Sequence, residues 1–165
     1  METVYIETSI VSYLVADSSR DLVTAANQQI TRDWWQQRQE SFACLISQEV
    51  LVEASRGDSE QVRRRLEVLA ALPRVAVSAD AQELARVFLA TGCLPPRAVR
   101  DAVHLAVATA IATDYLLTWN CRHLANAQIL KRLEREAQRA ARVLPRVCTQ
   151  LELMGELPYE TGSDS

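Results

Sequence analysis

The sequence predicts an α/β protein in which helices cover both faces of a central parallel sheet. Short apolar runs alternate along the chain with longer segments of helical composition. No hairpin turn signal joins one apolar run directly to the next. Strands that are separated by helices in this way pair in parallel, and parallel sheets are buried on both faces.

The first third of the chain is predicted to hold two strands and two helices. Residues 4–6 form a short apolar run, and Thr8 or Ser9 then offers a capping hydroxyl to a helix that reaches about residue 16. Residues 22–39 contain no Gly or Pro and are rich in Ala and Gln, which favours a second helix. Residues 42–46 are expected to form a buried strand.

The middle of the chain is predicted to be mainly helical. A helix is expected over residues 48–55, followed by a second helix that Pro73 ends. Residues 75–77 favour a short strand, and the next helix is expected over residues 79–91. Gly92 suits the position after that helix, where a left-handed backbone is common.

The last third is predicted to contain two helices and two strands. The Pro-Pro pair at 95–96 opens the most apolar helix of the chain, over residues 97–113. Residues 115–119 form a compact apolar strand, and a long helix is expected over residues 124–144. A last short strand is expected at residues 146–148.

Length and composition place these elements in one domain. Of the 165 residues, 48% are hydrophobic and 24% are charged, which is ordinary for a globular protein. We expect one domain over residues 1–155 and a polar, disordered tail over residues 156–165. No apolar run approaches the length that crosses a bilayer, so no membrane contact is expected. Four separated cysteines without a C-x-x-C pair or a secretory signal indicate the cytoplasm.

Acidic and amide side chains from four segments are predicted to meet at one edge of the sheet. Glu7 and Asn120 directly follow strands, and Asp101 lies in the first turns of the apolar helix. Glu49 and Glu53 lie four apart on the helix after the second strand, so spacing alone does not choose between them. The functional crevice of an open α/β sheet lies outside the carboxyl ends of its strands. Oxygen atoms gathered there suit Mg²⁺.

Spacing alone also leaves a purely structural interpretation open. Acidic residues often occupy first turns of helices, where they interact favourably with the helix dipole. The net charge of −3 argues against a protein that holds nucleic acid by bulk positive charge. It does not exclude a nuclease, because carboxylates that are clustered for a metal lower the isoelectric point.

Three segments resemble, in order and spacing, the motifs of PIN domains, most closely those of VapC-like toxins from bacterial toxin–antitoxin pairs. These segments are VYIETSIVSYL, SQEVLVEASRGD and RDAVHLAVATAIATDYLLTWN. The resemblance spans about residues 4–153. It implies a three-layer α/β/α sandwich and endoribonuclease activity that depends on Mg²⁺ or Mn²⁺. It also implies a protein antitoxin as partner and a toxin homodimer.

The resemblance places Glu7, Glu53, Asp101 and Asn120 at the four catalytic positions of the family. It implies that the first three are metal ligands and that Asn120 is a weaker ligand or positions water, and it selects Glu53 over Glu49. Two positions depart from the family pattern. Asp is commoner than Glu at the first, and Asn at the fourth lacks the charge of the Asp often found there, which favours a single metal.

Three further polar residues lie near these positions. Thr8 and Ser9 begin the first helix, where their hydroxyl and N–H groups either approach a metal-bound water or phosphate or act simply as caps. His104 lies three residues after Asp101 on the same helix face. It either hydrogen-bonds a ligand carboxylate, approaches the scissile phosphate or has a structural role.

The predicted function is therefore metal-dependent hydrolysis of RNA phosphodiester bonds, with water as the nucleophile, by the toxin of a toxin–antitoxin pair. The alternative is a PIN scaffold that binds RNA or a protein partner with weak or no catalysis. That alternative follows if the departures at Glu7 and Asn120 weaken the metal site.

Overall fold

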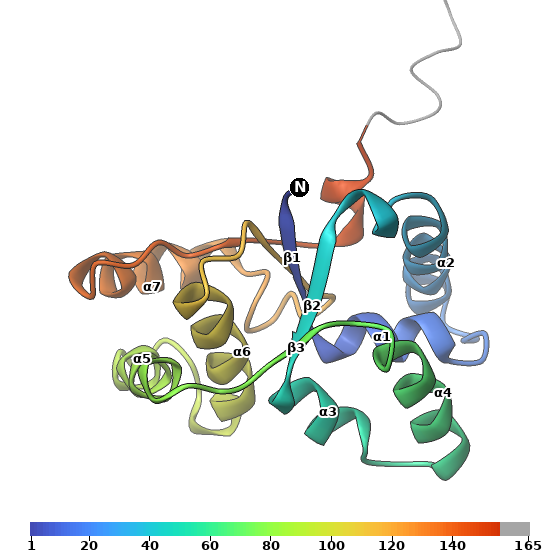
Figure 1. The fold of residues 1–165 in the computed structure, drawn as a ribbon, viewed down its shortest axis with the longest axis horizontal. Helices are drawn as coiled ribbons and strands as arrows, with labels where there is room; N and C mark the ends of the chain where they lie inside the picture. Colours follow the sequence, from blue (N-terminus) through green and yellow to red (C-terminus); the bar gives the residue numbers. More distant parts are fainter. Residues whose placement is uncertain (156–165) are drawn as a thin grey trace, which may run out of the picture.

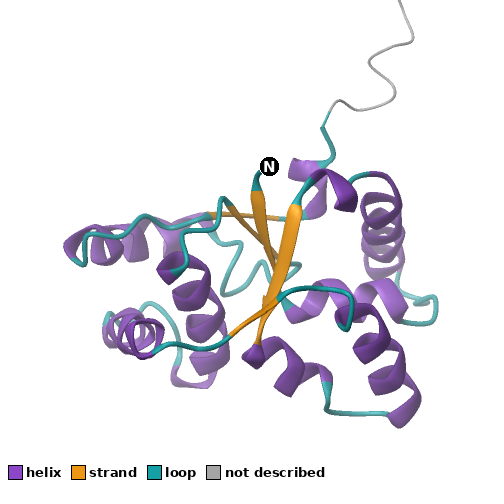
Figure 2. Ribbon diagram, viewed as in Figure 1, coloured by secondary structure: helices purple, strands orange, loops and turns teal. Residues whose placement is uncertain are grey.

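The computed structural model describes residues 1–155, so the expected tail at 156–165 lies outside the described residues. A five-stranded sheet with the order β3-β2-β1-β4-β5 forms the centre of the molecule, and every neighbouring pair is parallel (Figure 2). The strands are β1 (Thr3–Ile6), β2 (Ala43–Ser47), β3 (Arg74–Val75), β4 (Tyr115–Leu117) and β5 (Arg146–Cys148).

Helices cover both faces of this sheet (Figure 1). On one side lie α5, α6 and α7, and on the other lie α1, α2 and α4, with α3 at the carboxyl end of β2. The predicted three-layer α/β/α sandwich with a central parallel sheet is confirmed. The α-helices are α1 (Thr8–Val15), α2 (Leu22–Gln37), α3 (Gln48–Ala54), α4 (Ser59–Leu69), α5 (Ala79–Ala90), α6 (Val99–Ala110) and α7 (Ala127–Arg139), and the short 3₁₀ helices are η1 (Gln39–Ser41), η2 (Pro96–Ala98) and η3 (Gln150–Leu153).

Strand β1 lies at the centre because its side chains are buried on both faces. Val4, Tyr5 and Ile6 are all fully buried, as expected of a parallel strand between two helical layers. Tyr5 pairs with Leu45 of β2 on one side and Leu116 of β4 on the other. This register brings the carboxyl ends of the three strands together. The strand order reverses at this point, because β2 and β3 add to one side of β1 and β4 and β5 add to the other.

Two helices are shorter than the sequence predicts. The last helix was expected over residues 124–144 but spans 127–139, and the apolar helix was expected over 97–113 but spans 99–110 as an α-helix. Both end just before an alanine with a left-handed backbone, Ala112 at φ 55° and Ala141 at φ 54°. Alanine carries no signal for that conformation, whereas Gly92, at φ 73°, was predicted to adopt it. Within residues 1–155, no helix is long and apolar enough to span a membrane.

Two cysteines on the sheet are expected to resist alkylation in the native protein. Burial raises the pKa of Cys44 to about 11 and that of Cys148 to about 12. At pH 8 only about one in a thousand of the Cys44 thiols is then a thiolate, the reactive form. Cys121 is exposed. Iodoacetamide at pH 8 should therefore label Cys121 first, as measured by peptide mass spectrometry. Equal labelling rates of Cys44 and Cys148 before and after urea unfolding would contradict their burial.

Candidate metal site

Glu7 is held at the carboxyl end of β1 by groups from two chain segments. Its side chain is 5% exposed and caps α1 by accepting a hydrogen bond from the Ser9 backbone N–H at 3.0 Å. The same carboxylate accepts hydrogen bonds from the Ser9 hydroxyl and, at 2.7 Å, from the Thr118 hydroxyl just beyond β4. The Glu7 backbone N–H also donates to the Leu117 carbonyl at 3.1 Å. The β1–β4 junction therefore fixes this carboxylate.

Glu53 approaches the same place from α3. Its Oε1 atom accepts a hydrogen bond from the Thr8 hydroxyl at 2.8 Å and contacts Nε2 of His104. Burial raises the pKa of the Glu53 carboxyl, but the hydrogen bond and charge of His104, the Thr8 hydroxyl and the charge of Arg100 outweigh it. The pKa of Glu53 is therefore lowered, and the carboxylate is ionised at neutral pH.

Glu7, Glu53 and His104 form a three-residue cluster whose potential ligand atoms all lie within 4.8 Å of one another. Three different elements contribute these side chains: the end of β1, α3 and α6. The structure thus brings Glu7 and Glu53 together as the sequence predicts, and it places His104 between them and the core.

His104 is fully buried, and its second nitrogen begins a chain of hydrogen bonds to two residues of the sheet. Nδ1 lies 2.7 Å from the Tyr5 hydroxyl, which lies 2.6 Å from the Ser47 hydroxyl. Burial lowers the pKa of His104, but the hydrogen bond to Glu53 and the negative charges around the ring more than offset this, so the pKa is raised. Tyr5 and Ser47 were not predicted as residues of the site. The signal for Tyr5 was a hydroxyl group in the middle of an otherwise apolar strand.

Asp101, one turn before His104 on α6, and Asn120, two residues after Thr118, have partners outside the three-residue cluster. Oδ2 of Asp101 lies 3.0 Å from Nδ1 of His123. Oδ1 of Asn120 accepts hydrogen bonds from the backbone N–H groups of Arg122 at 3.2 Å and His123 at 3.0 Å. Asn120 thus shapes the turn that carries His123 to Asp101. Within residues 1–155, neither side chain hydrogen-bonds Glu7 or Glu53, and neither belongs to the three-residue cluster.

The remaining predicted residues have clear partners. Thr8 donates a hydrogen bond to Glu53, and Ser9 donates to Glu7. The Ser9 hydroxyl also accepts a hydrogen bond from the Trp119 backbone N–H at 2.9 Å. Both therefore orient the two carboxylates. Glu49 lies apart, with its Oε1 3.7 Å from Nε of Arg100. The structure separates Glu49 from Glu53, which spacing alone did not do.

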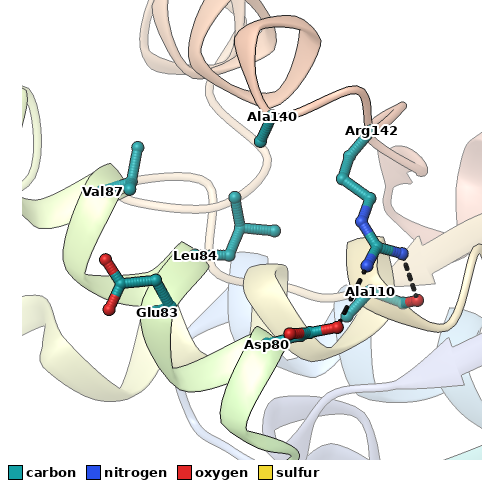
Figure 3. Close-up of a pocket in the computed structure, with 7 residues that line it drawn as sticks. All are labelled: Asp80, Glu83, Leu84, Val87, Ala110, Ala140 and Arg142. Carbon is teal, nitrogen blue, oxygen red and sulfur yellow. Dashed lines mark hydrogen bonds and ion pairs between the residues drawn. The ribbon is translucent and has the colours of Figure 1, made fainter.

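A groove between α5, α6 and the residues after α7 is separate from the three-residue cluster (Figure 3). Arg142 crosses it and donates to the Ala110 carbonyl at 3.1 Å and to the Asp80 carboxylate at 3.3 Å. The arginine caps the end of α6, and none of the cluster residues lines this groove. Its polar groups are thus engaged in holding helices together.

The topology, with two carboxylates at the switch point of the sheet, is the three-layer α/β/α sandwich that the PIN-like motifs of the sequence imply. No protein-family model and no curated protein sequence matches the chain. Solved structures share its fold, however, at sequence identities of 17 to 21%.

Three of these structures are toxin–antitoxin proteins. A chain of VapBC2 from Rickettsia felis, bound to a promoter DNA fragment, superposes with a TM-score of 0.58 at 17% identity, covering 89% of this chain and 98% of that one. The sarcin-ricin loop cleaving toxin VapC20 of Mycobacterium tuberculosis gives 0.55 at 17% identity, covering 68% and 86%. A toxin–antitoxin complex from Klebsiella pneumoniae gives 0.52 at 21% identity, covering 76% and 93%. The chain therefore has the fold of VapC toxins.

Proposed function

We propose that the protein is a metal-dependent endoribonuclease and the toxin of a toxin–antitoxin pair. The observation that carries this proposal is the convergence of Glu7 and Glu53, with His104, at the switch point of the sheet. A PIN-like neighbour that cleaves the sarcin-ricin loop supports RNA as the substrate class.

The side chains present fit a divalent cation. Glu7 and Glu53 offer carboxylate oxygens, which are the ligands that Mg²⁺ and Mn²⁺ accept. When bound, such an ion lowers the pKa of a coordinated water and neutralises the charge that develops on a phosphodiester. We assign Glu7 and Glu53 as the residues that hold it, and Asp101, one helical turn before His104, as the third carboxylate.

The other residues hold the carboxylates in place. Ser9 and Thr118 fix Glu7, and Thr8 fixes Glu53, so the two carboxylates are oriented before substrate arrives. In this proposal, Asp101 would exchange its contact with His123 for the ion, and Asn120 keeps the loop after β4 in shape. Water attacks the phosphorus and the bond between phosphorus and the 3′ oxygen breaks, so the products carry 5′-phosphate and 3′-hydroxyl ends.

The proposed partners follow from the fold neighbours. Two of them are structures of toxin–antitoxin assemblies, which supports a protein antitoxin as the partner of this chain. A homodimer and a cytoplasmic location stay predictions from the sequence. The competing function is a PIN scaffold with little catalysis, which would share the fold but bind no metal productively.

A cleavage assay with matched glutamate variants tests the proposal. Purified protein is incubated with a mixed pool of structured and single-stranded RNA in Mg²⁺, Mn²⁺ or EDTA. Glu53→Gln and Asp101→Asn should each lower cleavage on the order of 100-fold, because each removes a ligand charge. Glu49→Gln, on the same helix but paired with Arg100, should retain cleavage.

Two results would reject the metal-dependent nuclease. One is cleavage that persists in EDTA, and the other is a folded protein that cuts no RNA with either ion. The second result would favour the scaffold function.

A further inference from the structure

Glu7 is a buried carboxylate without a positively charged partner. Its hydrogen bonds all come from hydroxyl and backbone groups, and within residues 1–155 no arginine, lysine or histidine forms an ion pair with it. Glu53, in contact with His104, lies in the same cluster. The charge of Arg100 also acts on Glu53, whereas a protonated His104 would be the single positive charge shared between Glu53 and Glu7. Buried like charges at this spacing are unfavourable unless a cation joins them.

The ring of His104 is fixed in an orientation that suits metal ligation. Its Nε2 edge faces the carboxylate of Glu53, while Nδ1 lies 2.7 Å from the Tyr5 hydroxyl. The rings of Tyr5 and His104 also pack edge to face, with centroids 5.8 Å apart. Histidines that bind metals through one nitrogen typically use the other to hydrogen-bond a protein oxygen, which fixes the tautomer.

The buried hydroxyls allow either direction of proton donation. In one arrangement Ser47 donates to Tyr5, Tyr5 donates to Nδ1, and Nε2–H donates to Glu53. In the other arrangement Nδ1–H donates to Tyr5, which donates to Ser47, 2.6 Å away. The second arrangement removes the proton that Nε2 donates to Glu53, so a cation has to take its place between the Nε2 lone pair and the carboxylate.

We infer that His104 is itself a metal ligand through Nε2, so that an imidazole nitrogen binds the cation together with Glu7 and Glu53, beside Asp101 as the third carboxylate proposed above. This inference rests on the proposed metal site and changes its chemistry. Mg²⁺ strongly prefers oxygen ligands, whereas imidazole suits divalent transition ions. The site therefore selects a transition ion such as Mn²⁺ over Mg²⁺. Tyr5 is a positioning residue that holds Nδ1.

Spectroscopy of the Mn²⁺-loaded protein tests this inference without an activity readout. The chain has only two histidines, His104 and His123. In untagged protein, electron spin echo envelope modulation of bound Mn²⁺ should show coupling to a directly ligated ¹⁴N. The coupling should persist in His123→Gln and disappear in His104→Gln. The His123→Gln control leaves the core intact, so it assigns the signal even if His104→Gln folds poorly.

Affinity measurements provide a second readout. Competition between Mn²⁺ and Mg²⁺ should show that His104→Gln lowers the preference for Mn²⁺ about tenfold or more. Tyr5→Phe should keep the ¹⁴N coupling but weaken Mn²⁺ binding by roughly 10- to 100-fold, because the ring loses the acceptor for Nδ1.

The outcomes separate this inference from the proposed function. Mn²⁺ that binds with oxygen ligands alone would overturn the role of His104 and leave the nuclease proposal standing. A nitrogen coupling that survives in His104→Gln and vanishes in His123→Gln would also overturn it. Folded protein that binds no Mn²⁺ at millimolar concentration would overturn the metal-dependent nuclease itself.

Discussion

Replacing Glu7 by glutamine is expected to abolish metal-dependent RNA cleavage while leaving the fold intact. Glutamine keeps the length of the side chain and one acceptor oxygen for Ser9 and Thr118, but it removes the charge that holds the ion. We expect the cleavage rate to fall on the order of 100-fold or more. The measurement is the initial rate on a defined RNA in Mn²⁺.

Thermal unfolding separates lost metal binding from lost stability. Without metal, the Tm of Glu7→Gln should change little, because relief of repulsion with Glu53 offsets the loss of a charged helix cap. With Mn²⁺ at about 100 times its Kd, wild-type protein should gain about 2.7 kcal/mol, or roughly 5–10 °C, and the variant should gain nothing.

Two matched variants check the Glu7 result. Glu7→Asp keeps the charge but withdraws it by one methylene, so it should retain part of the activity. Glu2→Gln removes the same charge near the opposite end of β1, where Glu2 accepts a hydrogen bond from the exposed Tyr115 hydroxyl, and should leave cleavage unchanged. Wild-type rates in Glu7→Gln would remove Glu7 from the proposed site.

Replacing Trp34 by alanine is expected to cause the largest loss of stability in the protein, about 3–5 kcal/mol. Trp34 is fully buried on α2, and its ring stacks on Phe42 with centroids 5.8 Å apart. Its indole N–H donates to the Leu153 carbonyl at 3.1 Å and so ties η3 to α2. Alanine leaves a large cavity and an unpaired carbonyl, which adds to the cost.

The adjacent tryptophan provides the control for this prediction. Trp35 is only partly buried, so Trp35→Ala should cost about 1 kcal/mol. Trp34→Phe should fall between the two, because it keeps an aromatic ring but loses the hydrogen bond to Leu153. Urea unfolding followed by circular dichroism measures all three. Similar losses for Trp34→Ala and Trp35→Ala would show that the ring is less tightly packed than the structure indicates.

The class of the fold could be predicted from the amino-acid sequence, because the relevant signals are local. The short apolar run at residues 4–6, followed by a helical segment, predicts a buried parallel strand, and Glu7 directly after it must lie at the carboxyl edge of the sheet. Helix boundaries were predicted where the chemistry is particular, as at Gly92. They were missed at Ala112 and Ala141, which are ordinary residues with a left-handed backbone at helix ends closed by local hydrogen bonds to the helix's own carbonyls.

Which side chains meet could not be predicted from the sequence, because it depends on how distant segments pack. Glu53 and His104 are 51 residues apart, and no spacing rule connects two helices that pack from different parts of the chain. The same holds for Asp101 and His123, 22 residues apart, so the sequence could not show that Asp101 has a partner of its own. It could not choose between Glu49 and Glu53, or between Trp34 and Trp35. In each case the choice depends on what packs opposite, and that is a property of the folded chain.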